Sequence, residues 1–221
     1  MTLSRLAGTL PGMTANEPDA KSRYHHGDLH ESLLQAATLI IREAGVDGLS
    51  MRKLADRVGV SRTAPYHHFR DKQALLSELA LKGFRQYSQQ IDTLFADPLL
   101  DGVQQLEQFV RLYLKFALDN PELYNLMFGQ TLWKSGAPSE ALRTEAHTAF
   151  RDFVKRVAGW QQQAVLPAGA EALRFAQVAW STLHGLCRLV NDGIYVEASS
   201  IDEICATVLS LFRQQLSRSS V

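Results

Sequence analysis

The sequence predicts an all-α protein with two helical domains, and three observations support that prediction. Apolar residues recur at three- and four-residue spacing along most of the chain, and no convincing alternating strand pattern occurs. Clusters of Gly, Pro, Asn and Asp divide this pattern into pieces of helical length. Finally, 46% of the 221 residues are hydrophobic and 21% are charged, so the chain has enough apolar side chains for one or two folded domains.

The first predicted helix begins at Asp28, which has Glu31 three residues downstream, the spacing of a capping box. This helix ends before Gly45. Ser50 is a good N-cap for a second, short helix. The apolar face of the second helix is formed by Met51, Leu54, Ala55 and Val58.

A sharp turn and a third short helix complete this region. Gly59 stands where the second helix must end, because glycine adopts a positive φ without steric cost. Ser61 is predicted to cap the third helix, and Phe69 to return the chain to the interior. Pro65 removes a backbone donor early in this helix, so we predict that the helix is short or distorted.

Residues 50–72, SMRKLADRVGVSRTAPYHHFRDK, thus have the pattern of a helix-turn-helix unit. The spacing Leu-Ala-x3-Gly-Val-Ser-x4-Tyr-x-x-Phe-x-x-Lys resembles that of the TetR family of transcription regulators, and the match extends from about residue 36 to residue 76. The alternative, an ordinary helical hairpin with a solvated basic face, requires no such defined spacing. The resemblance implies a three-helix, homeodomain-like DNA-binding domain at residues 25–72 and a helical effector-binding and dimerisation domain at residues 73–217, after a flexible tail at residues 1–24.

Asp71 is predicted to cap a long helix that runs to about residue 95 with an apolar stripe at near-heptad spacing. In TetR-like proteins this helix is the strut between the two domains. Further helices are predicted near residues 101–118, 121–128, 138–163, 169–191 and 201–217, which gives about nine helices, the number typical of the family. The segments NPELYNLMF (120–128) and Trp180-Ser-Thr-Leu-His184-Gly185 also resemble one branch of the family, whose C-terminal domain is named for a Trp, a His and a Gly.

The formal net charge is zero, which at first argues against a polyanionic partner. The distribution is uneven, however. Residues 21–75 hold nine Lys and Arg against six acids, whereas residues 76–221 hold thirteen against fifteen. The positive end is therefore modest and local, and it would double in a dimer.

Side-chain chemistry indicates which residues would contact DNA. Arg62 lies in the first turn of the third helix, the part that such helices direct into the major groove, and Arg can bind guanine O6 and N7 with two hydrogen bonds. Groups one turn later more often meet phosphates, and by resemblance Tyr66, His68 and Lys72 are at positions that contact operator phosphates in relatives. The full predicted set is Ser50, Arg52, Ser61, Arg62, Thr63, Tyr66, His67, His68 and Lys72. Upstream, Lys21, Arg23, Tyr24 and His25 either reach an adjacent groove or belong to a solvated tail.

Aromatic side chains at helical spacing are concentrated in the middle helices, where most such residues form core. The family resemblance nevertheless implies a largely apolar effector pocket in this domain. The residues predicted to line it are Phe116, Phe128, Trp133, Phe150, Trp180 and His184. His184 is the candidate polar contact, and the alternative is a core histidine with its hydrogen bonds satisfied.

A palindromic operator requires two reading helices about one DNA turn (~34 Å) or a multiple apart, so a homodimer is expected. Two apolar stripes on the last two helices would form a four-helix bundle across a two-fold axis. The predicted interface residues are Leu183, Leu186, Cys187, Val190, Ile201, Ile204, Val208, Leu211 and Phe212. The alternative is that one stripe closes the core of the protomer.

Several other classes of function find no support in the sequence. No run of eighteen apolar residues indicates a membrane span, and the two cysteines, Cys187 and Cys205, lack the spacing of a metal site. An enzyme that uses His184 with Cys187 is disfavoured because no further ligand, triad or phosphate loop accompanies them. We therefore expect no cofactor, no metal and no catalysis. The expected protein is a cytoplasmic repressor that a small apolar effector releases from a double-stranded DNA operator, and the alternative is an effector-independent DNA-binding or activating protein of the same fold.

Overall fold

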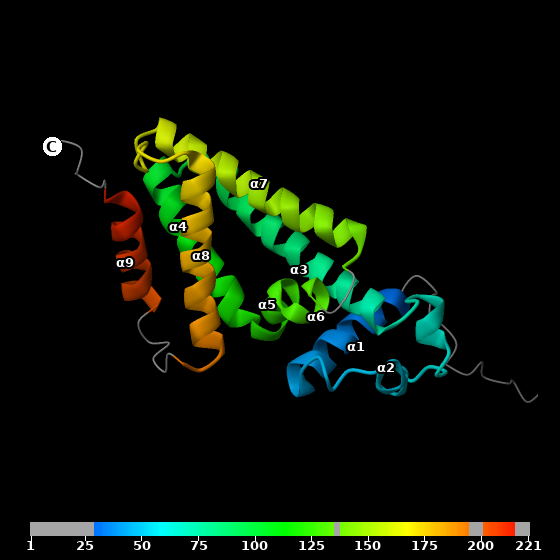
Figure 1. The fold of residues 1–221 in the computed structure, drawn as a ribbon. Coiled ribbons are helices and arrows are strands. Elements are labelled where there is room, and N and C mark those ends of the chain that lie inside the picture. Colours follow the sequence, from blue (N-terminus) through cyan, green and yellow to red (C-terminus); the bar gives the residue numbers. More distant parts are fainter. Residues whose placement is uncertain (1–28, 135–137, 195–200, 215–221) are drawn as a thin grey trace, which may run out of the picture.

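The structure is a computed structural model, and it describes residues 29–134, 138–194 and 201–214. These residues form helices and connecting turns, without a β-strand. The N-terminal head, residues 29–71, contains α1 (Leu29–Ala44), α2 (Met51–Val58) and a 3₁₀ turn, η1 (Ala64–His67). The long helix α3 (Lys72–Phe95) leads from this head into the second domain (Figure 1).

The second domain is built from the far half of α3 and the helices that follow it. These are α4 (Gly102–Asp119), α5 (Pro121–Phe128), α6 (Gln130–Trp133), α7 (Glu140–Gln162), α8 (Ala172–Asn191) and α9 (Ile201–Arg213). In Figure 1 α7 runs beside α3, while α4 and α8 lie side by side with α9 on the outside. The nine predicted helices are present within the described residues, and the one-turn helix α6 was not predicted.

Capping hydrogen bonds explain three helix boundaries, namely both ends of α2 and the start of α3. The Ser50 hydroxyl accepts a hydrogen bond from the Lys53 amide at 3.1 Å, and Asp71 accepts one from the Ala74 amide at 2.8 Å. At the end of α2, Gly59 has φ 77°, and its amide donates to the Ala55 carbonyl. All three caps were predicted. The predicted capping box at Asp28 lies outside the described residues. The same holds for the predicted tail, residues 1–24, and for the four upstream residues considered for DNA contact, Lys21, Arg23, Tyr24 and His25.

The third helix is short, as predicted from Pro65, but its predicted cap is wrong. η1 is a four-residue 3₁₀ turn that starts after Thr63, and no side chain caps it. The Ser61 hydroxyl instead forms a 3.1 Å hydrogen bond with the Thr63 hydroxyl. Pro65 is buried and has no amide hydrogen, so the segment closes through hydrogen bonds three residues apart, such as Tyr66 amide to Thr63 carbonyl.

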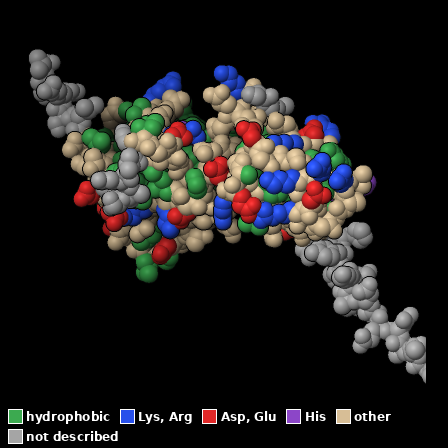
Figure 2. Space-filling model, turned by 90° about the horizontal axis from the view of Figure 1, so that it is seen from below, with side chains coloured by type: hydrophobic (Ala, Val, Ile, Leu, Met, Phe, Trp, Pro, Cys, Tyr) green, Lys and Arg blue, Asp and Glu red, His purple; other side chains and the backbone are tan. Residues whose placement is uncertain are grey.

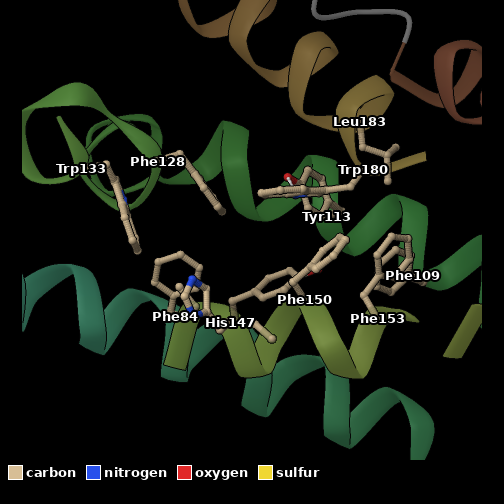
Figure 3. A pocket seen from close by; sticks show the side chains of 13 residues that line it. Phe84, Phe109, Tyr113, Phe128, Trp133, His147, Phe150, Phe153, Trp180 and Leu183 are labelled. Atoms are coloured by element: carbon tan, nitrogen blue, oxygen red, sulfur yellow. Dashed lines mark hydrogen bonds between the residues drawn. The ribbon is translucent and has the colours of Figure 1, made fainter. Parts of the chain in front are cut away.

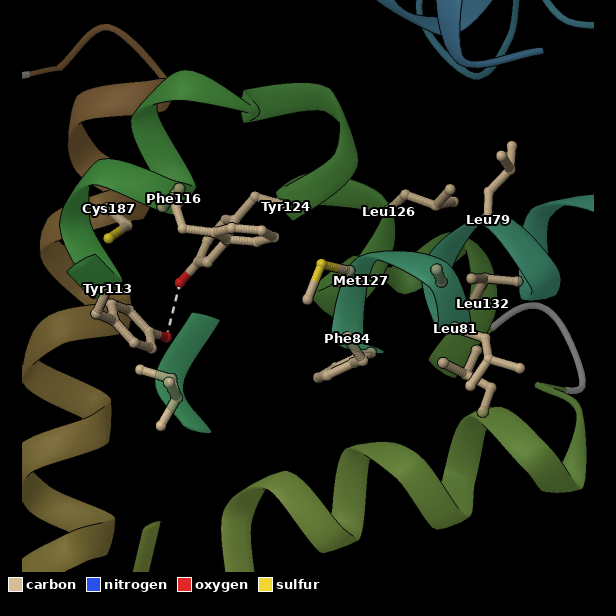
Figure 4. Close-up of a cluster of buried hydrophobic side chains, with 14 of the residues drawn as sticks. Leu79, Leu81, Phe84, Tyr113, Phe116, Tyr124, Leu126, Met127, Leu132 and Cys187 are labelled. Atoms are coloured by element: carbon tan, nitrogen blue, oxygen red, sulfur yellow. Dashed lines mark hydrogen bonds between the residues drawn. The ribbon is translucent and has the colours of Figure 1, made fainter. Parts of the chain in front are cut away.

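Helix α3 shares a continuous apolar core with both domains. Its N-terminal half buries Leu75, Leu76 and Leu79 against the head, and its C-terminal half packs against α7, α5 and α4. Glycine at position 83 allows α5 to cross α3 closely, because a Cβ there would lie only 2.7 Å from Met127 Sδ. Figure 4 shows this contact region, with Phe84 and Met127 between the two helices. The head and the second domain are therefore joined by packed side chains as well as by the chain itself.

Candidate nucleic-acid interface and ligand cavity

The segment around η1 presents a group of polar side chains to solvent. Ser61, Arg62, Thr63 and His67 are exposed, and Tyr66 is 55% exposed. Among the described residues no carboxylate pairs with Arg62, so its guanidinium keeps all its donors. The buried rings on either side of Tyr66, those of Pro65 and Phe69, anchor the turn and leave the polar side chains outside.

Helix α2 packs against this segment, and two predicted residues lie at its start. The oxygen of Ser50 is already an acceptor for the cap, although its hydroxyl hydrogen can still donate to a phosphate. Arg52 is exposed, and its Nε is 4.0 Å from the Asp56 carboxylate, a loose pair on the helix surface. Both side chains are accessible to DNA.

The last two predicted residues, His68 and Lys72, are half-buried and also support the head. The His68 ring lies 5.7 Å from the ring of His30, which stacks on Phe69. Lys72 Nζ donates to the Val46 carbonyl at 2.7 Å, so it ties α3 to the loop between α1 and α2. An ammonium group has three donors, so Lys72 retains two for a phosphate oxygen.

The charge of the head is mixed rather than uniformly basic. Arg57 donates two hydrogen bonds of 2.6 Å to Glu43, and these bonds lower the pKa of the Glu43 carboxyl. Arg70 is similarly paired with Asp71. Figure 2 shows Lys and Arg side chains interspersed with Asp and Glu on this half of the molecule. The described part of the head therefore presents mixed charge rather than a large positive field.

The second domain contains a partly open cavity of about 400 Å³, the aromatic cavity, between α3, α4, α5, α6, α7 and α8 (Figure 3). Its lining is almost entirely apolar. The lining residues are Phe84, Tyr87, Phe109, Tyr113, Phe128, Trp133, Ala146, His147, Ala149, Phe150, Phe153, Trp180 and Leu183. Four predicted pocket residues are among them, namely Phe128, Trp133, Phe150 and Trp180.

The other two predicted pocket residues, Phe116 and His184, do not line the aromatic cavity. Phe116 is 4% exposed and packs edge-on against Tyr87 at 5.4 Å, outside the cavity wall. The Nδ1 atom of His184 is 2.6 Å from the Tyr124 hydroxyl, so this ring serves a buried hydrogen-bond network. His184 is thus a core histidine with a satisfied hydrogen bond, the alternative considered above.

Several lining residues were missed by the sequence analysis. Phe84 and Tyr87 lie on α3, where their spacing is the same as that of the core leucines. His147 and Phe153 lie on α7, next to the small residues Ala146 and Ala149 that leave the space open. The alternation of alanine and phenylalanine in AHTAFRDF (146–153) is the signal that could have indicated a cavity wall on this helix.

A chain of hydrogen bonds forms the back of the aromatic cavity. The Trp180 indole donates to the Tyr113 hydroxyl at 2.8 Å, that hydroxyl is 2.9 Å from the Tyr124 hydroxyl (Figure 4), and the latter reaches His184 Nδ1. Burial lowers the pKa of His184, with a smaller contribution from the positive charge of Arg188, and burial raises the pKa of both tyrosines. Neutral forms therefore prevail, and these hydrogen bonds are consistent with donation from Trp180 to Tyr113, from Tyr113 to Tyr124 and from Tyr124 to His184 Nδ1.

The proposed dimer residues divide into two groups. Leu183, Cys187 and Val208 are 1%, 0% and 3% exposed, because these sides of α8 and α9 pack within the protomer. These three predicted interface residues thus face the interior of the protomer. The remaining side chains are half-buried or exposed, and they are Leu186, Val190, Ile201, Ile204, Leu211 and Phe212. Val178, 68% exposed on α8, was not predicted.

Two properties of the described residues limit other interpretations of the site. No helix among them is long and apolar enough to cross a membrane. In the same part of the chain, no group of three or more His, Cys, Asp or Glu side chains is arranged to hold a metal ion.

Comparisons with known proteins identify both domains. Residues 33–79 match the bacterial regulatory proteins of the tetR family, and residues 106–212 match the tetracyclin repressor-like C-terminal domain. The tetracycline repressor protein class A from transposon 1721 of Escherichia coli is 53% identical over 49 residues, which are 22% of this chain and 23% of that repressor. The match thus spans about a quarter of the length of this curated relative.

Solved structures share the fold over nearly the whole chain. A protein of unknown function from Rhodococcus sp. RHA1 is 30% identical with a TM-score of 0.74, covering 88% of this chain and 100% of that one. PfmR, a TetR family transcriptional regulator from Thermus thermophilus, is 21% identical with a TM-score of 0.64, covering 84% and 99%. The chain belongs to the TetR family of transcriptional regulators.

Proposed function

We propose that this protein is a sequence-specific DNA-binding repressor that loses operator affinity when a small, largely apolar molecule occupies the aromatic cavity. One observation carries the proposal: α3 contributes to both sites. Phe84 and Tyr87 of this helix line the cavity, while Lys72 at its first turn is hydrogen-bonded to the head. A cavity of about 400 Å³ also favours an effector-responsive protein over the effector-independent alternative.

On the DNA side, Arg62 would read a base in the major groove. Its exposure and lack of a carboxylate partner within the described residues support this role. Tyr66, His67 and the hydroxyls of Ser61 and Thr63 would contact neighbouring phosphates or base edges. Ser50, Arg52, His68 and Lys72 would hold the backbone on either side.

Two copies would place two heads on a palindromic operator. The outward sides of α8 and α9 supply the contact, because Val178 and Leu211 are exposed by 68% and 59%. Gly185 on the same side of α8 has no atom within 4 Å of its Cβ position, which would let a partner helix approach closely. This surface replaces the inward part of the predicted interface.

Ligand binding would bias the orientation of α3 relative to the head. Phe84 and Phe128 meet edge-on at 5.2 Å in the cavity wall, and α5, which carries Phe128, also packs against α1. A molecule that separates these rings would shift α3 and α5, the two helices that pack against α1 of the head. The two heads of a dimer would then no longer match two half-sites.

The test is a titration of the purified protein against the DNA upstream of its own gene, followed by fluorescence anisotropy across a salt series. Specific binding should weaken by about 1–3 kcal/mol on the preferred site when Arg62 is replaced by Ala. Arg143→Ala, at an exposed arginine on α7 outside the head, is the matched control and should leave binding unchanged. Absence of any sequence preference for DNA at every salt concentration would contradict the proposal.

A further inference from the structure

A second, smaller cleft of about 150 Å³ adjoins the aromatic cavity between α3 and α7. Four residues belong to both linings, and they are Tyr87, Phe109, Ala149 and Phe153. The far side of the smaller cleft is polar. Its charged lining residues are Asp92, Glu145, Asp152 and Arg156, three carboxylates against one guanidinium.

Two of these carboxylates are already neutralised at close range. Asp92 accepts a 2.8 Å hydrogen bond from Arg156, whose guanidinium also lies 4.0 Å from the centre of the Phe95 ring. Asp152 accepts a 2.7 Å hydrogen bond from Lys155. These pairs leave little charge for another partner.

Glu145 is different, because its nearest partners are distant. The closest cationic atom, Arg85 Nε, is 4.0 Å away, and the Ser88 hydroxyl is 3.5 Å away. The Glu145 side chain is only 26% exposed. A half-buried carboxylate with such weak partners has capacity for a further cation.

The two cavities meet near Glu145. Ala149 lies one helical turn further along α7, belongs to both linings and carries only a methyl group. Ala146, the residue after Glu145, also lines the aromatic cavity. Small side chains thus separate the aromatic rings from the carboxylate.

The aromatic cavity itself favours cations over anions. Its lining contains no Asp, Glu, Lys or Arg among the described residues, and nine Phe, Tyr and Trp rings surround it. The faces of aromatic rings attract cations, most strongly where water is excluded. The hydroxyls of Tyr113 and Tyr124 are occupied by each other and by Trp180 and His184, so they offer an anion little.

We infer that the effector of this protein is an amphipathic amine. Its aromatic or hydrocarbon body would fill the aromatic cavity, and its cationic nitrogen would lie past Ala149, against Glu145. This inference rests on the proposed function, since it names the chemical class of the effector. In this arrangement Glu145 selects effectors that carry a positive charge, and the aromatic rings select their shape.

The structure gives weaker support for an anionic effector. His147, which also lines the aromatic cavity, and Arg151 border an adjoining open groove of about 520 Å³, which Thr144 and Phe150 also line. Both side chains are exposed to water, and Arg151 donates to the Thr148 hydroxyl. Their attraction for a carboxylate would be screened by solvent and salt, whereas Glu145 is mostly shielded.

Three probes of similar length and different charge test the inference. They are 4-phenylbutylamine, 4-phenylbutan-1-ol and 4-phenylbutyrate, which are cationic, neutral and anionic at pH 7. Binding to the purified full-length protein is followed by calorimetry and by the fluorescence of Trp133 and Trp180, which line the aromatic cavity. We expect the amine to bind about tenfold more tightly than the alcohol, and the carboxylate to bind most weakly.

Three variants test whether the cationic nitrogen of the ligand binds at Glu145. Glu145→Gln keeps the shape of the side chain and should weaken the amine about fivefold without changing the alcohol. Asp152→Asn is the matched control, because Asp152 is already paired with Lys155, and it should alter neither. Ala149→Leu, with folding checked by circular dichroism, should weaken the amine by filling the junction.

Equal binding of amine and alcohol, tightest binding of the carboxylate, or an amine affinity unchanged by Glu145→Gln would each overturn the inference. These measurements use protein without DNA, so their result is independent of repression. A separate titration of the operator complex with 4-phenylbutylamine tests the release step. Tight amine binding without any effect on DNA would leave the ligand class intact and contradict the proposed function.

Discussion

Met127 Sδ lies only 2.7 Å from the position that the Cβ atom of a side chain at Gly83 would take. Leu123 adds a second contact, with its Cδ1 atom 3.0 Å from the same point. The two helices that meet here, α3 and α5, both line the aromatic cavity and both pack against α1. At this crossing, the same two helices therefore form part of the cavity wall and pack against the head.

Replacing Gly83 with Ala should destabilise the protein. The helical preference of Ala would contribute about 1 kcal/mol of stability, but displacement of two side chains of α5 should cost about 1–3 kcal/mol. The measurement is the free energy of unfolding in urea. Gly159→Ala is the control, because no atom lies within 4 Å of its Cβ position in α7, and it should raise stability by about 0.5–1 kcal/mol. Equal effects of the two substitutions would contradict a tight crossing at Gly83.

Tyr124→Phe should be costly although it removes a single oxygen atom. That hydroxyl lies between the Tyr113 hydroxyl at 2.9 Å and His184 Nδ1 at 2.6 Å, so its loss leaves the buried Tyr113 hydroxyl without an acceptor and His184 Nδ1 without a donor. We expect a loss of about 1–3 kcal/mol in urea unfolding. Tyr66→Phe, at a side chain that is 55% exposed, should change stability by less than about 0.5 kcal/mol. Comparable losses at both positions would exclude the network as the cause.

The stability of the protein should depend on the protonation of His184. Burial, and secondarily the charge of Arg188, lower the pKa of this imidazole below its ordinary value of 6.5. The unfolded chain then binds the proton at a higher pH than the folded protein, so protonation favours unfolding. The contribution of His184 to stability is complete above about pH 6.5 and is lost as the pH falls from there through the folded pKa.

Urea unfolding between pH 7.5 and 5.5 measures this loss. His184→Asn keeps an acceptor near the position of Nδ1 but cannot take up a proton in this range, and it should flatten the slope. His147→Asn, at an exposed histidine, is the control and should retain the slope. Identical slopes for wild type and His184→Asn would refute the assigned role.

Lys72→Ala should affect DNA binding and stability together. The variant has no ammonium group to offer a phosphate, and the Val46 carbonyl loses the donor that lies at 2.7 Å in the wild type. We expect weaker binding to all DNA sequences with a flatter salt dependence, and a loss of about 1 kcal/mol in thermal or urea unfolding. Arg62→Ala should differ by leaving stability unchanged, because its side chain is exposed and has no carboxylate partner in the described residues. A Lys72→Ala protein of wild-type stability would show that the hydrogen bond to Val46 contributes little.

Local chemistry made the helix boundaries predictable. Ser50, Gly59 and Asp71 each satisfy backbone groups within a few residues, so a short stretch of sequence contains all the relevant information. Ser61 failed as a cap because Pro65 changes the geometry of the following turn from α to 3₁₀. The one-turn helix α6 was too short to produce a periodic signal.

The site was less predictable, because helical periodicity does not distinguish a core from a cavity. Phe84 and Phe116 both lie on apolar stripes, yet only Phe84 lines the aromatic cavity. Leu183 and Leu211 are likewise both apolar residues of the last two helices, and they are 1% and 59% exposed. These differences arise from how helices distant in sequence pack together, and no local pattern encodes them.

The single 3₁₀ turn at residues 64–67 has a consequence for selectivity. This turn has four residues with a rise of about 2 Å per residue, so it is short, and few of its side chains can reach base edges in a DNA groove. Each half-site would then supply little information, and most discrimination between DNA sequences would come from the distance between half-sites and from how easily the intervening DNA bends. In such an arrangement α3 would set the distance between the two heads of a dimer, so a ligand that tilts this helix would change which operators fit as well as how tightly they are held.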